Sequence, residues 1–207
     1  MSETYNKLLK HIEKSNAYET AITLFQWDSE TLAPEKSMEL TSKSIGILSN
    51  EYYNSLINEE VKGLLNQLSQ EQEMEQLDFK QKAIVKKLKK TFDDMEPIPP
   101  QEYQAYQELV AKAPSIWARA KEENLYPLFV PYLEEIMNYN KKFAGYRAKE
   151  GQNLYDVLLN DYEEGFNTQQ LDLFFSKIKA AIVPLLKEVV KKNDTIQKDY
   201  NYQAFDI

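Results

Sequence analysis

The number of histidines largely determines whether this sequence can bind a metal ion. It contains one histidine, His11, and no cysteine. A zinc protease helix carries His-Glu-x-x-His, because this spacing places two imidazoles on one face and the glutamate beside the metal-bound water. A carboxylate-bridged di-iron bundle needs Glu-x-x-His twice, and Leu8 stands where that glutamate would be. We therefore predict no metal-binding residue in this chain and interpret His11 as a surface or boundary residue.

Carboxylates are the other residues whose spacing could support chemistry. General acid–base work needs two carboxylates in different environments, several ångström apart across a substrate. The pairs Glu163/Glu164 and Asp28/Glu30 are close in sequence, which gives no evidence of that geometry. We interpret Asp28 and Glu30 as solvated residues at a helix junction, and we predict no catalytic residue in this chain.

Phosphate-binding and nucleic-acid-binding patterns are also missing from the sequence. It has no Gly-rich phosphate loop and no Gly-x-Ser-x-Gly elbow. The lysines that flank Leu88 favour a solvated helix face over a basic binding patch; they are Lys86, Lys87, Lys89 and Lys90. The aromatic residues recur at core spacing. We predict no cofactor-binding residue and no cofactor in this chain.

Charge and composition narrow the class of protein. The 207 residues carry a formal net charge of −8, which argues against nucleic acid and anionic membranes as partners. The N-terminus lacks the apolar core of a signal peptide, and no apolar run approaches the ~20 residues that span a bilayer. These patterns predict a soluble, cytoplasmic protein without a membrane partner.

Any functional side chains of this chain must be positioned by helices, because glycine is scarce and apolar residues recur at helical spacing. We expect a first helix from Tyr5 to Phe25, interrupted over residues 27–33. Pro34 suits the first turn of a second helix. Its apolar face is predicted to contain Met38, Thr41, Ile45, Leu48 and Tyr52. Asn58 is expected to cap a third helix.

The middle of the chain contains its clearest break. A fourth helix is predicted over residues 74–92, and a fifth from Glu102 onward. Between them, residues 95–101 hold three prolines and mark either a corner between helical layers or a hinge. Pro114 lies within the fifth helix and is expected to kink or end it.

The last third of the sequence continues the helical pattern. A sixth helix is expected over residues 129–146 and a short one over 155–162. Asn167 and Gln170 fit a capping box that opens the last long helix, which Pro184 is expected to bend. Residues 193–207 have weak periodicity. The predicted fold class is all-α, with residues 1–207 forming one helical region.

Four stretches, in this order, resemble motifs of the carboxypeptidase Taq family of zinc metallocarboxypeptidases. Trp27–Pro34 is similar to its Trp-Asp-x-Glu-Thr-x-Met-Pro signature, and Ile116–Ala120 to its Trp-x-x-Ala-Arg region. Phe129–Ile136 resembles Phe-x-Pro-x-Leu-x-x-Ile, and Tyr155–Gly165 resembles Tyr-Asp-x-Leu-Leu-Asp-x-Tyr-Glu-Pro-Gly. The resemblance covers nearly the whole chain.

The sequence departs from the family motifs at a few positions. Ala33 replaces the usual methionine, Glu164 replaces the usual proline, and Arg119 and Ala120 are transposed. None of the matched stretches carries the family's metal ligands. These departures therefore leave the family's zinc chemistry untouched.

The resemblance implies a mainly helical, groove-containing peptidase fold, of which this chain is the N-terminal part. Family members remove C-terminal residues from peptides, use zinc or another divalent metal, and are commonly homodimers. Their His-Glu-x-x-His helix would begin beyond Ile207. The implied partners are therefore a C-terminal catalytic portion, peptide substrates and a second copy of the chain.

Two functional hypotheses follow from these observations. The first is an N-terminal helical segment of a zinc-dependent metallocarboxypeptidase, lacking the zinc motif and inactive alone. The alternative is a free-standing, non-catalytic helical module for protein interaction. Both predict uncovered apolar surface and self-association of the isolated chain.

Overall fold

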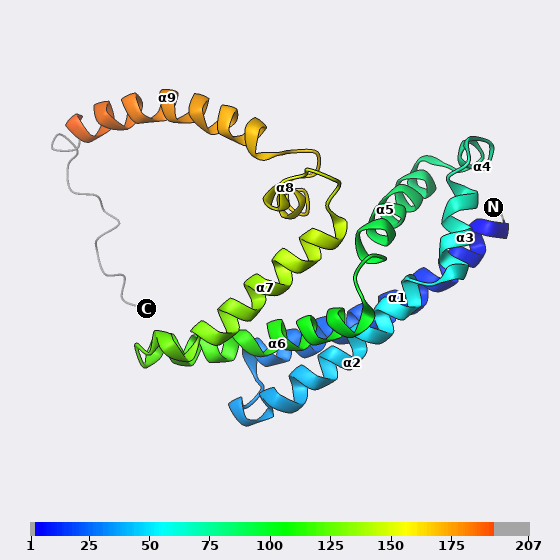
Figure 1. The fold of residues 1–207 in the computed structure, drawn as a ribbon, viewed down its shortest axis with the longest axis horizontal. Coiled ribbons are helices and arrows are strands. Elements are labelled where there is room, and N and C mark those ends of the chain that lie inside the picture. The colour runs from blue at the N-terminus through cyan, green and yellow to red at the C-terminus, as the bar shows by residue number, and fades with distance from the viewer. Residues whose placement is uncertain (1–2, 193–207) are drawn as a thin grey trace, which may run out of the picture. The chain divides into compact units, whose positions relative to one another are not determined.

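The computed structural model describes residues 3–192, and the regular elements found there are all helical (Figure 1). No β-strand occurs in this described range. The all-α prediction is confirmed. The expectation for residues 193–207 lies outside the described residues. The longer helices are α1 (Glu3–Thr31), α2 (Met38–Leu56), α3 (Glu59–Leu68), α5 (Phe79–Met95), α6 (Pro100–Glu122), α7 (Val130–Arg147) and α9 (Thr168–Lys192).

The chain divides into two compact units, residues 1–149 and residues 150–207. The first contains α1 to α7, with a short α4 (Glu71–Glu75) and two 3₁₀ turns, η1 (Glu35–Ser37) and η2 (Tyr126–Leu128). The second contains α8 (Leu154–Leu159) and α9. That residues 1–207 form one helical region stays a prediction.

The first helix is longer than the sequence pattern predicts. The expected interruption over residues 27–33 is wrong at its start, because α1 continues to Thr31 and ends only within that stretch. The Ser29 and Thr31 hydroxyls donate to carbonyls one turn earlier, which helical backbone readily permits. Pro34 precedes the 3₁₀ turn η1, and α2 begins only at Met38. The placement of Pro34 in the first turn of the second helix is therefore also wrong.

Helix α2 packs against both α1 and α6 (Figure 1), and small residues lie along its buried face. Ser42, Gly46 and Ser49 are buried along α2. A Cβ added at Gly46 would lie 3.2 Å from the Cβ of Glu108 on α6. The two helices approach closely because no side chain intervenes at this position. The buried face of α2 is therefore centred on these small residues, which lie between the large apolar residues predicted from the sequence.

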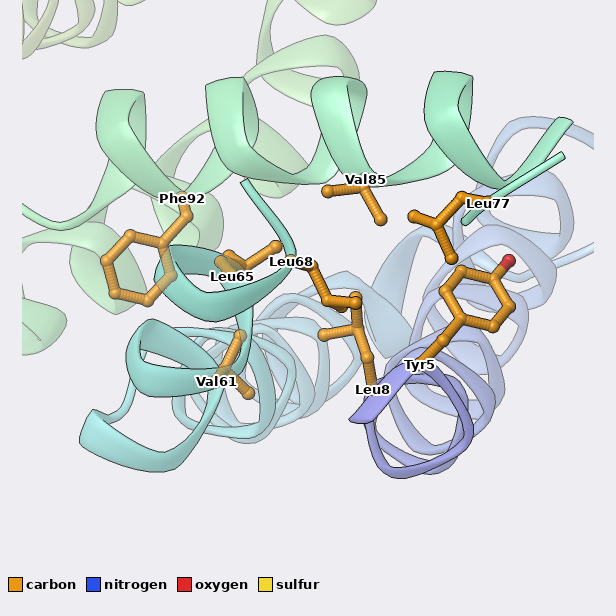
Figure 2. Close-up of a cluster of buried hydrophobic side chains, with 8 residues drawn as sticks. All are labelled: Tyr5, Leu8, Val61, Leu65, Leu68, Leu77, Val85 and Phe92. Atoms are coloured by element: carbon orange, nitrogen blue, oxygen red, sulfur yellow. The ribbon is translucent and has the colours of Figure 1, made fainter. Parts of the chain in front are cut away.

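A second packed region joins α1, α3 and α5 (Figure 2). Leu8, Val61, Leu65 and Val85 have no exposed surface. Burying side chains of this size stabilises the fold by roughly 1.5–3 kcal/mol each. The buried cluster consists of Tyr5, Leu8, Val61, Leu65, Leu68, Leu77, Val85 and Phe92.

Capping residues fix where α3 and α5 begin. The predicted cap is confirmed, since the Asn58 side chain accepts from Val61 N at 2.9 Å. The fourth predicted helix is wrong at its start, because α4 ends at Glu75 and α5 begins at Phe79. Asp78 and Gln81 form a capping box there, with bonds of 2.9 and 3.0 Å. This cap starts a new helix inside the apolar periodicity of residues 74–92, which had been predicted as one helix.

The proline-rich segment joins α5 to α6 in a turn that is bonded to α2. The Tyr53 hydroxyl donates to Ile98 O at 2.7 Å, and the Ile98 side chain is buried. Pro100 begins α6, where its missing N–H costs nothing. Pro114 does not end α6, which continues to Glu122. That part of the expectation is wrong.

The second unit has a short helix, a tight turn and a long helix. The predicted capping box is confirmed, since Gln170 N donates to Asn167 Oδ1 at 2.9 Å and Asn167 N to Gln170 Oε1 at 3.0 Å. The Asp156 carboxylate accepts from Thr168 N at 2.8 Å and thus holds α8 against the start of α9. Helix α9 has no buried residue among those described.

Candidate functional site

The side chains that could hold a metal do not come together in the described part of the chain. No group of three or more histidine, cysteine, aspartate or glutamate residues is placed to share an ion within residues 3–192. His11 lies on α1 with its Nε2 3.4 Å from Glu60 Oε2 on α3. One imidazole beside one carboxylate does not fit a peptidase metal, which needs at least three protein ligands.

The acidic pairs and the lysine run lie on solvated surface. Glu163 and Glu164 are exposed beside Gly165, which adopts a positive φ of 85°. On α5, Lys89 pairs with Asp93 one turn along the helix, and Lys90 and Asp94 form a second pair of this kind. Such pairs contribute little energy and are typical of a helix face in water.

A hollow of about 520 Å³ lies between the end of α1, the start of α2 and the middle of α6. Two stretches that carry the family resemblance meet in it, Trp27–Pro34 from α1 and Ile116–Ala120 from α6. Its floor is apolar and one carboxylate lies on its wall. The lining includes Ser29, Glu30, Met38, Ile45, Pro114 and Trp117.

A smaller and more polar hollow of about 230 Å³ adjoins the first, and the two share Gln26. Burial raises the pKa of Tyr103 strongly and that of Tyr52 to a lesser extent, and the nearby Glu19 carboxylate adds to both shifts. Both tyrosines are therefore neutral at physiological pH. The lining includes Glu19, Thr23, Ser49, Tyr52, Tyr103 and Gln107.

These two hollows were not predicted from the sequence. Glu30, which we interpreted as a solvated junction residue, lines the larger hollow, while Asp28 does not. The sequence did contain a signal for the larger hollow. Two of the stretches that resemble the family's motifs line it, although they lie far apart in the sequence. Arg119 adds a contact between the same regions, with its Nη1 3.8 Å from Glu35 Oε1.

Exposed apolar side chains gather on α9. Leu185 is 64% exposed, Val190 62% and Leu173 60%, although a helix in water normally hides one apolar face. The exposed large apolar residues of this helix are Leu173, Phe174, Phe175, Ile182, Val183, Leu185, Leu186, Val189 and Val190. Exposed large apolar residues gathered on one helix are typical of an interaction surface. None of the described helices is both long and apolar enough to cross a membrane.

Comparisons with known proteins agree with the four resembling stretches. The profile of the carboxypeptidase Taq (M32) metallopeptidases matches residues 7–207. Carboxypeptidase 1 of Bacillus subtilis is 34% identical over 206 residues, which are 98% of this chain and 40% of that protein. Thermostable carboxypeptidase 1 of Pyrococcus furiosus is 26% identical over 191 residues, covering 92% of this chain and 38% of the relative.

Solved structures show the same relationship in three dimensions. The crystal structure of BsuCP superposes with a TM-score of 0.84 at 32% identity, over 91% of this chain and 37% of that one. The apo-Mg structure of a Pyrococcus furiosus carboxypeptidase gives a TM-score of 0.74 at 25% identity, over 93% of this chain and 38% of that one.

The sequence profile and the structural superpositions together define a helical metallopeptidase class. This chain belongs to the carboxypeptidase Taq (M32) metallopeptidase family. It spans about 40% of the length of the relatives it matches.

Proposed function

We propose that this chain is the N-terminal helical portion of a metal-dependent carboxypeptidase that removes C-terminal residues from peptides. The catalytic residues, and zinc or another divalent metal, would be supplied by the region of the relatives that this chain does not cover. The 207 residues alone would then be inactive. One histidine, no cysteine and the absence of a ligand cluster in the described range support this division.

The observation that carries the proposal is the exposure of α9. This helix buries none of its described side chains, and nine large apolar residues are exposed along it. Exposed hydrocarbon costs roughly 25 cal/mol for each Å² that could be buried. The remaining part of a carboxypeptidase is the partner that best accounts for this helix, because the chain covers only 40% of Carboxypeptidase 1.

A reconstitution experiment tests this proposal. The purified chain would be mixed with the part of Bacillus subtilis Carboxypeptidase 1 that lies beyond the matched region, with zinc or cobalt and a short peptide. We expect the two parts to form a complex, and release of C-terminal residues to require both. Release by the 207-residue chain alone would refute the proposed division of labour.

A matched pair of variants keeps this test specific. Leu186→Glu places one charge among the exposed apolar residues of α9, whereas Gln169→Glu adds the same charge at an exposed position near its start. We expect the first to weaken complex formation at least tenfold and the second to leave it nearly unchanged. Equal effects of both variants would contradict docking through α9.

The alternative is a non-catalytic helical interaction module, and the same surface supports it. In that case the chain would not bind the carboxypeptidase fragment and would bind an unrelated partner in pull-down experiments.

We also propose a homo-oligomeric assembly and a cytoplasmic location for the full protein. Sedimentation of the reconstituted complex and fractionation of cells that express the natural gene test these two statements.

A further inference from the structure

The larger hollow has dimensions and chemistry that suit a small ligand. Its volume of about 520 Å³ lies within the range of ~300–1,000 Å³ that is typical of ligand pockets. Met38 is 8% exposed and Ile45 1%, so the floor is built from the packed interior of α2. A pocket of this size with an apolar floor can remove a hydrocarbon chain of several carbons from water.

The polar groups around this hollow leave one charged acceptor. The Ser29 hydroxyl donates to Phe25 O at 2.8 Å, and the Ser115 hydroxyl donates to Lys112 O at 3.0 Å. Both hydroxyl hydrogens are therefore used within their own helices. The Glu30 carboxylate takes part in no hydrogen bond or ion pair within residues 3–192. It is the group of this hollow that can compensate a ligand charge.

Trp117 adds an aromatic wall on the α6 side. Its ring lies 5.1 Å from Lys121 Nζ, so one cation already approaches it. The face of a tryptophan favours cations, and its edge packs against hydrocarbon. An anionic ligand would meet the carboxylate of Glu30 and be repelled. A neutral apolar ligand would gain no charge compensation from that carboxylate, which is exposed to water.

We propose that this hollow binds a small amphiphilic amine, with its alkyl body over Met38 and Ile45 and its ammonium group at Glu30. The inference does not depend on the peptidase proposal, because α1, α2 and α6 build the site without any further chain. The smaller neighbouring hollow is lined mainly by hydroxyl, amide and phenol groups, so it would not accept the alkyl body.

Glu19 provides an internal control on the same helix. Glu19 and Glu30 are 11 positions apart, which separates them by about 16 Å along the helix axis. This exceeds the Debye length of about 8 Å at physiological ionic strength. Glu19 lines the smaller hollow only, so its charge should have little influence on an ammonium group at Glu30.

Titration calorimetry with n-octylamine on the intact 207-residue chain tests the site. We expect one binding event, and no binding of octanoate at the same concentration. Glu30→Gln should weaken octylamine binding roughly fivefold, while Glu19→Gln should leave it unchanged. Ala111→Leu, which fills the hollow from α6, should reduce binding further. Far-UV circular dichroism would confirm that each variant is folded.

Several results would overturn the assignment. Octanol or octanoate binding as tightly as octylamine would remove the role of the carboxylate. An equal loss in Glu30→Gln and Glu19→Gln would show a general charge effect rather than a site. Tighter binding of the peptide acetyl-Leu-Lys-Leu-amide would assign the hollow to a peptide segment instead of a free amine. Failure of reconstitution with a carboxypeptidase fragment would leave this inference standing.

Discussion

Replacing Tyr53 with phenylalanine removes one hydroxyl from the contact between α2 and the turn that joins α5 to α6. Tyr53 is 4% exposed, and its hydroxyl donates to Ile98 O at 2.7 Å. The ring of phenylalanine keeps the packing against Tyr103, whose ring centroid is 5.4 Å away. The substitution therefore isolates the hydrogen bond from the hydrophobic contact.

The magnitude follows from what the Ile98 carbonyl loses. A net hydrogen bond contributes about 0.5–1.5 kcal/mol, and a buried group left without a partner costs about 1–3 kcal/mol. We expect Tyr53→Phe to lower the free energy of unfolding by about 1–2 kcal/mol. With a urea m-value of about 2 kcal/mol/M, the midpoint of unfolding should fall by roughly 0.5–1 M.

Urea titrations followed by far-UV circular dichroism measure this shift. Tyr162→Phe is the matched control, because Tyr162 is 88% exposed and loses the same oxygen atom in water. It should change stability by less than about 0.5 kcal/mol. If Tyr53→Phe shifts the midpoint no more than the control, the turn over residues 95–101 is not held by this bond, and a hinge becomes the better interpretation.

Three further predictions concern the core, alkaline pH and association. Leu65→Ala should lower the free energy of unfolding by about 2–5 kcal/mol, because Leu65 is fully buried. The control Leu40→Ala, at a position that is 73% exposed, should lower it by less than about 0.5 kcal/mol; chemical unfolding measures both. Burial raises the pKa of Tyr103 above its ordinary value of 10.0. The unfolded chain therefore loses this proton first, so stability should fall as pH rises above 10, and Tyr103→Phe should lessen the slope of that fall. Sedimentation should show self-association of the isolated chain that Leu186→Glu reduces, since nine apolar residues of α9 are exposed; a monodisperse monomer would contradict this.

Local signals predicted the parts of the fold that depend on local chemistry. The Asn58 cap and the Asn167–Gln170 capping box were predicted correctly, because each is decided within four residues. The same reasoning failed where two signals competed. The periodicity that joined residues 74–92 concealed the cap at Asp78, and the break expected over residues 27–33 was placed too early, since α1 ends at Thr31.

The sequence by itself determined the helical class, the family and the scarcity of metal ligands, because these depend on residue types and their order along the chain. Tertiary structure decided what those residues form together. Glu30 on α1 and Trp117 on α6 line one hollow because both helices pack against α2. The side chains of α9 are exposed, although their periodicity is that of a buried face. Burial depends on which helices meet, and that is a property of the packed chain rather than of any one segment.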